Sequence, residues 1–579
     1  MQKIKSWRVE IICVLLLLLC IFFGTKISPS ISDVKLIQKD SESAESLPIS
    51  EEVGDNQNFQ VSMHYSPGIF SKAIWKITPD DCLNKIKVGT QIFYTDTIPG
   101  HCNYVNGFSI SSADFLREKQ EEETDLTFFL KNNGGPGGIS IALQSASVFS
   151  FGYLTITFFI FGVLLFCLLH RFKIPTPFAF AIVIATLLHG IYALNTPHTV
   201  RAHDVEGHVN YIKYVAEELK IPADNDCWTC YQPPVYYTAM APIWTIANFS
   251  HIDSTKAIQW ASVILSFLLM TFGFVCFRSF LTGKILWAAT LLWLFCPIGF
   301  LIAPRIGNDQ FFFAAHALTL MGVMLYANNK SSKFLLLAAI SCWISFWSKS
   351  TGSVTVAIWC IGFVVGYVTR DSWKMKKSEY AAIIIMLFLF AGMILRLFFG
   401  KEIVGNAESL HSGLAISAAP INLLVFDVLD FLKTTYTSAW NDEGGRQFFI
   451  NYMAKTSLFG EFTLTRTPFG IWCATLLNLS AFVLAIYAFV GFWKHKFSKA
   501  TLILTAQGIL FFAAMAFLRI KIPYACSSDF RYVMPMLLSF IPFVSMGIFK
   551  ENSSTKWKNL GVAMTIIFCA SSVLLMLSL

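Results

Sequence analysis

Long apolar segments recur along most of the chain, and most of them are close to 20 residues long. A helix of that length rises about 30 Å, which matches the hydrocarbon core of a bilayer. The pattern therefore predicts a polytopic α-helical membrane protein with about 13 spanning helices. We expect them at 11–23, 149–170, 176–194, 254–277, 284–303, 310–328, 333–348, 352–370, 381–399, 470–493, 500–518, 533–549 and 559–578.

Six short segments between these predicted helices are basic. They are "HRFK" (170–173), "RSFLTGK" (278–284), "NNKSSK" (328–333), "RDSWKMKK" (370–377), "KHKFSK" (494–499) and "KENSSTKWK" (550–558). Because Lys and Arg accumulate on cytoplasmic loops, all six are expected inside. The basic start "MQKIKSWR" predicts that 1–24 is a retained signal anchor leading outward. Helices 2–3 then occupy 148–194, helices 4–9 occupy 254–399, and helices 10–13 occupy 470–579.

This topology leaves three sizeable segments on the extracytoplasmic side: 25–147, 195–253 and 400–469. The first contains short alternating stretches such as "NFQVSMHY" and "QIFYTD", separated by turn clusters such as "NNGGPGG". Alternation of this kind predicts a β-rich, sandwich-like domain. Cys82 and Cys102 lie in it, and an oxidising compartment favours a disulfide between them.

The second outer segment contains "RAHDVEGHVNYIKYV" (201–215), which places five titratable side chains within eight residues. From Asp204 onward the apolar positions step by four and three, which predicts a helix with one apolar stripe. The stripe comprises Val205, Val209, Ile212, Ala216 and Leu219. After "QPP", 232–249 predicts a second, short helix, and both would lie at the membrane surface. Between them, "CWTC" predicts a local disulfide of Cys227 and Cys230, with a redox or metal site as the alternative.

The order of these motifs resembles the GT-C superfamily of integral-membrane glycosyltransferases. The similarity rests on "HDVEGHVNYI", "QPPVYY", "PRIGND" (304–309), "WSKSTG" (347–352), "SLFGEF" (457–462) and "RYVMP" (531–535). The chain looks most like bacterial members similar to the aminoarabinose lipid A transferase and the protein O-mannosyltransferases. The resemblance covers about 176–549 and implies a GT-C-like core. The first two helices and the β-rich insert lie outside it.

The resemblance implies transfer of a sugar from a polyprenyl-phosphate donor to a glycan, lipid or protein acceptor, with inversion. Such a reaction needs a carboxylate that takes the proton of the acceptor hydroxyl. Asp204 matches the first-loop acidic position, Glu206 is an alternative there, and Asp309 is the second-loop candidate. Each aspartate can also be read as a helix N-cap. His203, His208, Gln232 and Tyr236 are candidate substrate contacts.

Five basic residues map to the outer ends of predicted helices, against the usual charge bias. They are Arg305, Lys349, Arg519, Lys521 and Arg531. Cations at that level can pair with the phosphate of a lipid donor. They can equally snorkel to outer-leaflet headgroups. In the third outer segment, Trp440, Asp442, Glu443 and Arg446 are further candidate contacts or simply a solvated loop.

Composition agrees with a membrane location, since 55% of residues are hydrophobic and only 14% are charged. The net charge of +8 follows from the basic loops, so we expect the bilayer and no nucleic acid as a partner. No cofactor or metal is expected, although Asp204 and His208, one turn apart, leave a divalent ion possible. The family likeness implies a bacterial inner membrane, with the site facing the periplasm. A lipid-linked oligosaccharide polymerase or ligase, and a transporter or flippase, remain alternatives.

Overall fold

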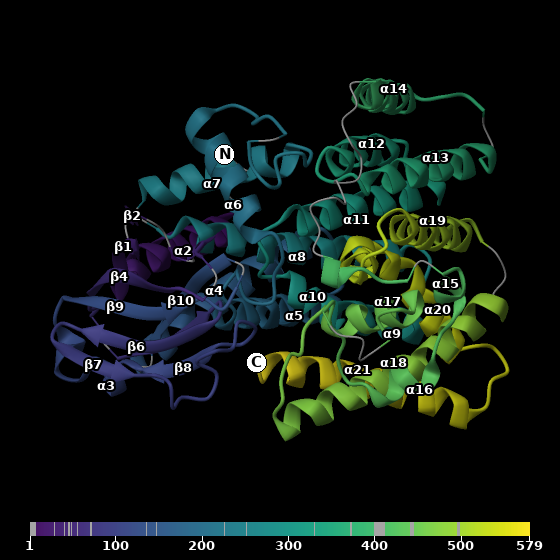
Figure 1. Cartoon of the computed structure of the whole chain (residues 1–579). Helices are drawn as coiled ribbons and strands as arrows, with labels where there is room; N and C mark the ends of the chain where they lie inside the picture. The colour runs from purple at the N-terminus through teal and green to yellow at the C-terminus, as the bar shows by residue number, and fades with distance from the viewer. Residues whose placement is uncertain are drawn as a thin grey trace. The chain divides into compact units, whose positions relative to one another are not determined.

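A computed structural model describes most of the chain (Figure 1). The described residues are 7–27, 29–39, 41–44, 47, 49–54, 56–69, 72–134, 136–145, 148–224, 226–250, 252–328, 331–370, 373–398, 412–417, 419–440, 445–494 and 498–579. The chain divides into two compact units. One is Met1–Leu187 with Leu194–His203, and the other is Leu188–Ala193 with Asp204–Leu579.

The first unit contains a β-sandwich of two antiparallel sheets, so the predicted β-rich region is present. One sheet has the order β2-β1-β4-β9-β6-β7 and the other the order β3-β10-β5-β8. The strands are β1 (Ser30–Gln38), β2 (Ser41–Ala44), β3 (Ile49–Glu52), β4 (Asn58–Ser66), β5 (Ala73–Pro79), β6 (Cys82–Val88), β7 (Gln91–Tyr94), β8 (Phe108–Ser111), β9 (Thr124–Lys131) and β10 (Pro136–Ser145). Two short helices, α3 (Ser112–Phe115) and η1 (Arg117–Glu121), follow β8.

Both sheets contribute to one buried hydrophobic cluster, because alternate residues of each strand point inward. Trp75 of β5 is fully buried and its ring contacts Tyr65 of β4, Phe128 of β9 and Phe115 of α3. These contacts join the two sheets face to face. A disulfide links Cys82, at the start of β6, to Cys102 in the loop after β7.

Helices α2 (Arg8–Ile27), α4 (Val148–Arg171) and α5 (Thr176–Asn195) flank the sandwich in sequence. Helices α2 and α4 lie side by side, and Glu10 of α2 forms an ion pair with Arg171 of α4. Helix α2 covers the predicted anchor at 11–23.

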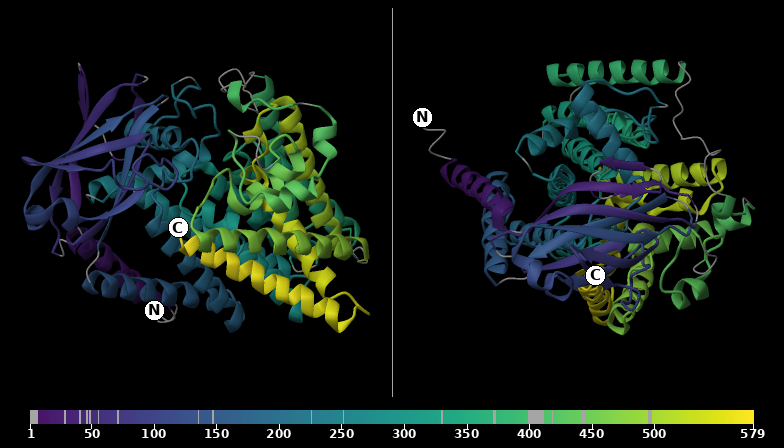
Figure 2. Two further views of the ribbon diagram at one scale, coloured as in Figure 1. Left: turned by 60° about the horizontal axis from the view of Figure 1, so that its bottom comes forward. Right: turned by 60° about the vertical axis from the view of Figure 1, so that its left-hand side comes forward.

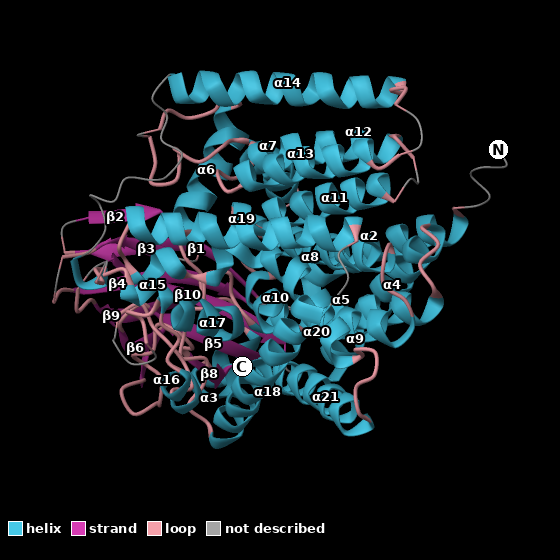
Figure 3. Ribbon diagram, turned by 90° about the vertical axis from the view of Figure 1, so that its right-hand side faces the viewer, coloured by secondary structure: helices cyan, strands magenta, loops and turns pink. Residues whose placement is uncertain are grey.

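The second unit is helical. Its elements are α6 (Val205–Glu218), α7 (Val235–Phe249), α8 (Ser254–Arg278), α9 (Gly283–Leu294), α10 (Pro297–Ile302), α11 (Asn308–Ala327), α12 (Lys333–Phe346), α13 (Gly352–Val368), α14 (Lys377–Phe398), η3 (Ser412–Leu414), α15 (Ile421–Leu424), α16 (Val428–Lys433), α17 (Phe449–Phe459), α18 (Pro468–Lys494), α19 (Lys499–Lys521), η4 (Ala525–Ser528), η5 (Phe530–Met536), α20 (Leu537–Ile548) and α21 (Thr555–Leu577). Helix α12 packs on both α11 and α14 (Figure 3), and α21 runs beside α18 (Figure 2).

Nine helices in the described part of the chain are long and apolar enough to cross a membrane, so the expected number of 13 is not confirmed. Three of the predicted spans form shorter helices, α9, α12 and α13. The span predicted at 284–303 is interrupted, because Pro297 lacks an N–H and starts a separate helix, α10, instead of continuing α9. Helix α12, with 14 residues, rises only about 21 Å, less than the core of a typical bilayer.

Candidate functional site

Helices α6 and α7 are held together by a buried aromatic cluster. The ring of Tyr237 stacks on Tyr211 at a centroid distance of 3.6 Å, and the Tyr237 hydroxyl is 2.8 Å from Nδ1 of His208. Burial lowers the pKa of His208 to about 4, against the opposing charges of Asp204 and Asp309, so the imidazole is neutral at neutral pH. The cluster fixes the position of α6 and hence of its N-terminus.

The same two helices are joined to the loop before α11. The backbone N–H of Gly307 donates to the hydroxyl of Tyr236 at 3.0 Å. A β-carbon at Gly307 would lie 3.3 Å from the His208 ring, so this close approach favours glycine. The disulfide Cys227–Cys230 lies in the connection between α6 and α7.

Asp204 occupies the N-cap position of α6, but its side chain makes no capping hydrogen bond. Its backbone is left-handed, with φ of 57°, a conformation that aspartate tolerates better than most residues. The side chain is 44% exposed, and Oδ2 lies 3.7 Å from a guanidinium nitrogen of Arg531. Capping therefore does not account for Asp204. Glu206, in the first turn of α6, is exposed.

Arg531 is the cation to which Asp204 points. It lies in η5 and is buried, with Nε 3.1 Å from Oδ2 of Asp529 and Nη2 donating to the Tyr532 hydroxyl at 2.9 Å. Asp529 caps η5 by accepting the backbone N–H of Arg531. The carboxylate thus orients both the backbone and the guanidinium of Arg531.

A second ion pair, between Asp309 and Lys349, lies close to the first. Asp309 is in the first turn of α11, and Lys349 is in the loop between α12 and α13. The Lys349 ammonium lies 5.0 Å from the ring centroid of Tyr532, the residue that also contacts Arg531. The two ion pairs therefore share an aromatic neighbour.

An amide bridge ties these loops to the start of α7. Nδ2 of Asn308 donates to the Gln232 side chain at 3.2 Å and to the backbone carbonyl of Ser348 at 2.9 Å. The Gln232 side chain therefore holds Asn308 in place, and Asn308 directly precedes Asp309.

Arg305 is buried between α10 and α11. None of its three side-chain nitrogens has a hydrogen-bond partner within the described residues. Its guanidinium lies 5.5 Å from the centroid of the Phe462 ring. A buried cation whose donors are unmet costs several kcal/mol unless an anion meets them. Arg305 is therefore suited to bind an anionic group.

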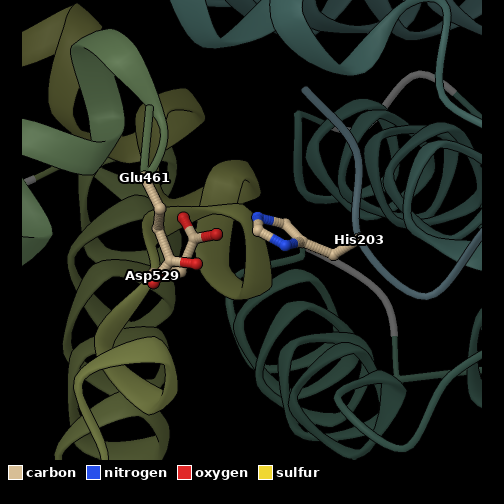
Figure 4. Close-up of side chains that lie close together, drawn as sticks. All are labelled: His203, Glu461 and Asp529. Atoms are coloured by element: carbon tan, nitrogen blue, oxygen red, sulfur yellow. The ribbon is translucent and has the colours of Figure 1, made fainter. Parts of the chain in front are cut away.

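Two buried carboxyl groups, Glu461 and Asp529, lie next to each other (Figure 4), with one oxygen of each within 4.8 Å of the other. Burial and the Asp529 charge raise the pKa of Glu461 to about 8, and its Oε1 accepts a hydrogen bond from the Tyr452 hydroxyl. Mg²⁺ is commonly held by one or two carboxylates with substrate phosphates, so this pair is where a divalent ion could bind. His203, drawn in the same figure, is the last residue of the first unit.

The other candidates have separate positions. Arg519 is buried and donates to the backbone carbonyls of Ser417 and Gln447, so it braces the third outer segment. Lys521 is exposed at the end of α19. Trp440 is exposed, whereas Arg446 is buried and donates to the carbonyls of Gly413 and Ala439. Asp442 and Glu443 lie outside the described residues.

Sequence reasoning missed Asp529, Glu461 and Tyr452. A signal existed for two of them, since Glu461 lies within "SLFGEF" and Asp529 precedes "RYVMP" by two residues. The signal for Asp529 was an acidic residue close to a basic one, Arg531, at the outer end of a predicted span, and it went unused.

No family model matches this chain, and no curated protein matches it. Among solved structures, the apo form of the oligosaccharyltransferase of Archaeoglobus fulgidus is similar, with a TM-score of 0.40 and 12% sequence identity. The match covers 69% of this chain and 55% of that protein, so the chain corresponds to little more than half its length.

Proposed function

We propose that the chain is a membrane glycosyltransferase of the GT-C type, which moves a sugar from a polyprenyl-phosphate carrier to an acceptor, with inversion. The observation that carries the proposal is the cluster in which the half-exposed Asp204 faces the buried cation Arg531, with Lys349 sharing its aromatic neighbour. A carboxylate base for the acceptor hydroxyl and cations for the departing phosphate are the two requirements of this reaction.

In this proposal Asp204 is the general base. Its carboxylate takes the proton of the acceptor hydroxyl while that oxygen bonds to the anomeric carbon. The bond between this carbon and the phosphate oxygen breaks, and the lipid phosphate leaves with the electron pair. Asp204 is suited to this role because it is accessible and is not used as a cap.

The phosphate is proposed to bind Arg531, Lys349 and Arg305. Asp529 and Tyr532 hold Arg531 in one orientation, and Asp309 holds Lys349. Arg305 brings donors that no described side chain or carbonyl uses. Charge that grows on the leaving phosphate is stabilised by cations fixed in advance, because they need no reorganisation during the reaction.

We further propose that the site faces the periplasm of a bacterial cell from the inner membrane, which the six basic loops support. Transport is less well supported. His316, a titratable residue within the predicted span at 310–328, forms a hydrogen bond with Thr355 at 2.9 Å and packs against Phe511, as a structural histidine would. A polymerase or ligase would use a lipid-linked oligosaccharide at the same kind of site, and product mass separates it from a single-sugar transferase.

The test compares surface glycans and lipids by mass in cells with the wild-type protein, without it, and with Asp204→Asn, at matched membrane levels. We expect the deletion to remove one sugar unit from one product and Asp204→Asn to reproduce that loss. Glu217→Gln is the matched control, since it removes a carboxylate from the exposed far end of the same helix. Full activity of Asp204→Asn would refute the catalytic assignment, and loss of a whole repeat chain would favour the polymerase.

A further inference from the structure

A second feature of the helical unit lies where α18 ends and α21 begins. A cavity of about 390 Å³ is lined by Phe489, Val490, Trp493, Lys494, Lys550, Ser553, Ser554 and Trp557. Helices α18, α20 and α21, which lie next to its lining residues in sequence, pack on one another. Its volume is in the range of small-ligand sites.

Among the described residues that line this cavity, two are cations and none is an acid. Lys494 is the last residue of α18, and Lys550 follows α20. Within the described residues, neither ammonium group has an ion-pair partner or a hydrogen bond. Next to them, the hydroxyls of Ser553 and Ser554 form the turn into α21, where Ser554 accepts the N–H of Trp557 at 3.2 Å. This combination is complementary to an anion.

The other side of the cavity is aromatic. The rings of Phe489 and Trp493 stack at 6.2 Å, and both side chains are about two-thirds exposed at 66% and 67%. Trp557 is fixed by donating its ring N–H to the carbonyl of Gly547 at 3.0 Å and by packing on Tyr487. A rigid, exposed aromatic wall beside lysines is the composition of a membrane interface.

The position along the helices matches that composition. Helices α18 and α21, with 27 and 23 residues, are long enough to cross a bilayer, and the cavity lies at their shared end. Its two lysines belong to "KHKFSK" and "KENSSTKWK", basic loops that are expected in the cytoplasm. The cytoplasmic leaflet carries anionic lipids, and basic cavities between helices bind their headgroups.

We infer that this cavity binds the phosphate-bearing headgroup of an anionic phospholipid. Lys494 and Lys550 pair with the phosphate, while an acyl chain lies along Phe489 and Trp493. This inference concerns the end of the helices away from the candidate functional site and does not depend on the proposed transferase activity.

Titration of the purified full-length protein with phosphatidylglycerol, followed by native mass spectrometry, tests the inference. Phosphatidylcholine with the same chains is the neutral reference. Lys494→Gln/Lys550→Gln is expected to lower the affinity for phosphatidylglycerol by about 30-fold. The matched control is Lys556→Gln/Lys558→Gln, which removes two lysines from the same loop region outside the cavity, and it should stay within about twofold of wild type.

Ser553→Phe provides a second route, because it fills the cavity and keeps all four lysines. It is also expected to abolish the preference for phosphatidylglycerol over phosphatidylcholine. If the double lysine variant does not fold, this variant alone tests the inference. Equal losses in the two lysine pairs would overturn the inference in favour of general surface attraction. Complete competition by millimolar inorganic phosphate would overturn the lipid assignment and indicate a site for a free anion.

Discussion

At the scale of single residues, the protonation of Glu461 should make the stability of the folded protein depend on pH. Its pKa is raised to about 8 by burial and the Asp529 charge, whereas an unfolded glutamate titrates near 4.3. The folded protein therefore keeps a proton that the unfolded chain releases. Stability contributed by this group is complete below about pH 4.3 and falls as pH rises towards 8.

Glu461→Gln imitates the protonated carboxyl and can still accept the Tyr452 hydroxyl. We expect its melting temperature to equal that of wild type near pH 5 and to exceed it by about 3 °C at pH 8. Tryptophan fluorescence during heating in detergent measures the difference, in which all other titrating groups cancel. Glu217→Gln, which removes an exposed carboxylate from α6, is the control measured alongside it. A pH-independent difference for Glu461→Gln would contradict the assigned pKa.

The residue scale also shows what sequence reasoning can reach. Asp204, Lys349 and Arg531 were proposed from motif position, and the structure brings Asp204 within 3.7 Å of Arg531, with Lys349 beside Tyr532. Arg519 was proposed only because it lies at the outer end of a predicted span, and it braces a loop. Glu461 was missed because its charge is altered by burial beside Asp529, which depends on two segments 68 residues apart in sequence meeting in space.

At the scale of elements, the joint between α6 and α7 should control the site because α6 carries Asp204 at its N-terminus. Tyr237→Phe removes the hydroxyl that forms a hydrogen bond with His208. A buried imidazole nitrogen then lacks that partner. We expect a loss of about 1–3 kcal/mol in unfolding free energy and, through the displaced helix, about tenfold in transfer rate. Thermal unfolding and a sugar-transfer assay measure the two effects.

Tyr211→Phe is the matched control for this prediction. Its ring stacks on Tyr237, but within the described residues its buried hydroxyl has no hydrogen-bond partner. Removing that hydroxyl should leave stability unchanged or slightly increased. If Tyr211→Phe and Tyr237→Phe were equally destabilising, the hydrogen bond to His208 would not be what holds the joint.

The sequence pattern predicted most of the helices, but some helices differ from the prediction in their bounds or in their buried faces. A helix was predicted from Asp204, and α6 begins at Val205. Its buried face includes His208 and Tyr211 in addition to apolar residues, whereas Leu219 is 87% exposed. Polarity alone assigns such histidines and tyrosines to the surface, but on α7 Tyr237 hydrogen-bonds His208 and stacks on the ring of Tyr211. Likewise, a hydropathy profile does not reveal that Pro297 divides a predicted span into α9 and α10.

At the scale of the whole molecule, alternating charge and the lengths of the spans lead to different predictions for the topology. The loops at 304–309, 349–351 and 519–532 were all assigned to the outer side, and in the helical unit their residues Arg305, Lys349 and Arg531 lie around Asp309, Asp529 and Tyr532. This assignment predicts that α12 and α13 both cross, although they have 14 and 17 residues. Local thinning of the bilayer accommodates short spans at modest cost.

Reporter fusions test this arrangement directly. Alkaline phosphatase, active only outside the cytoplasm, should be active after residues 305, 348 and 523, whereas green fluorescent protein should fluoresce after 280, 328, 370 and 550. The fusion at 348 is decisive because it follows the shortest span, α12. A fluorescent fusion there would place Lys349 on the opposite side from Arg531. The ion pair with Asp309 and the contact with Tyr532 could then not coexist, and the proposed phosphate site would be refuted with them.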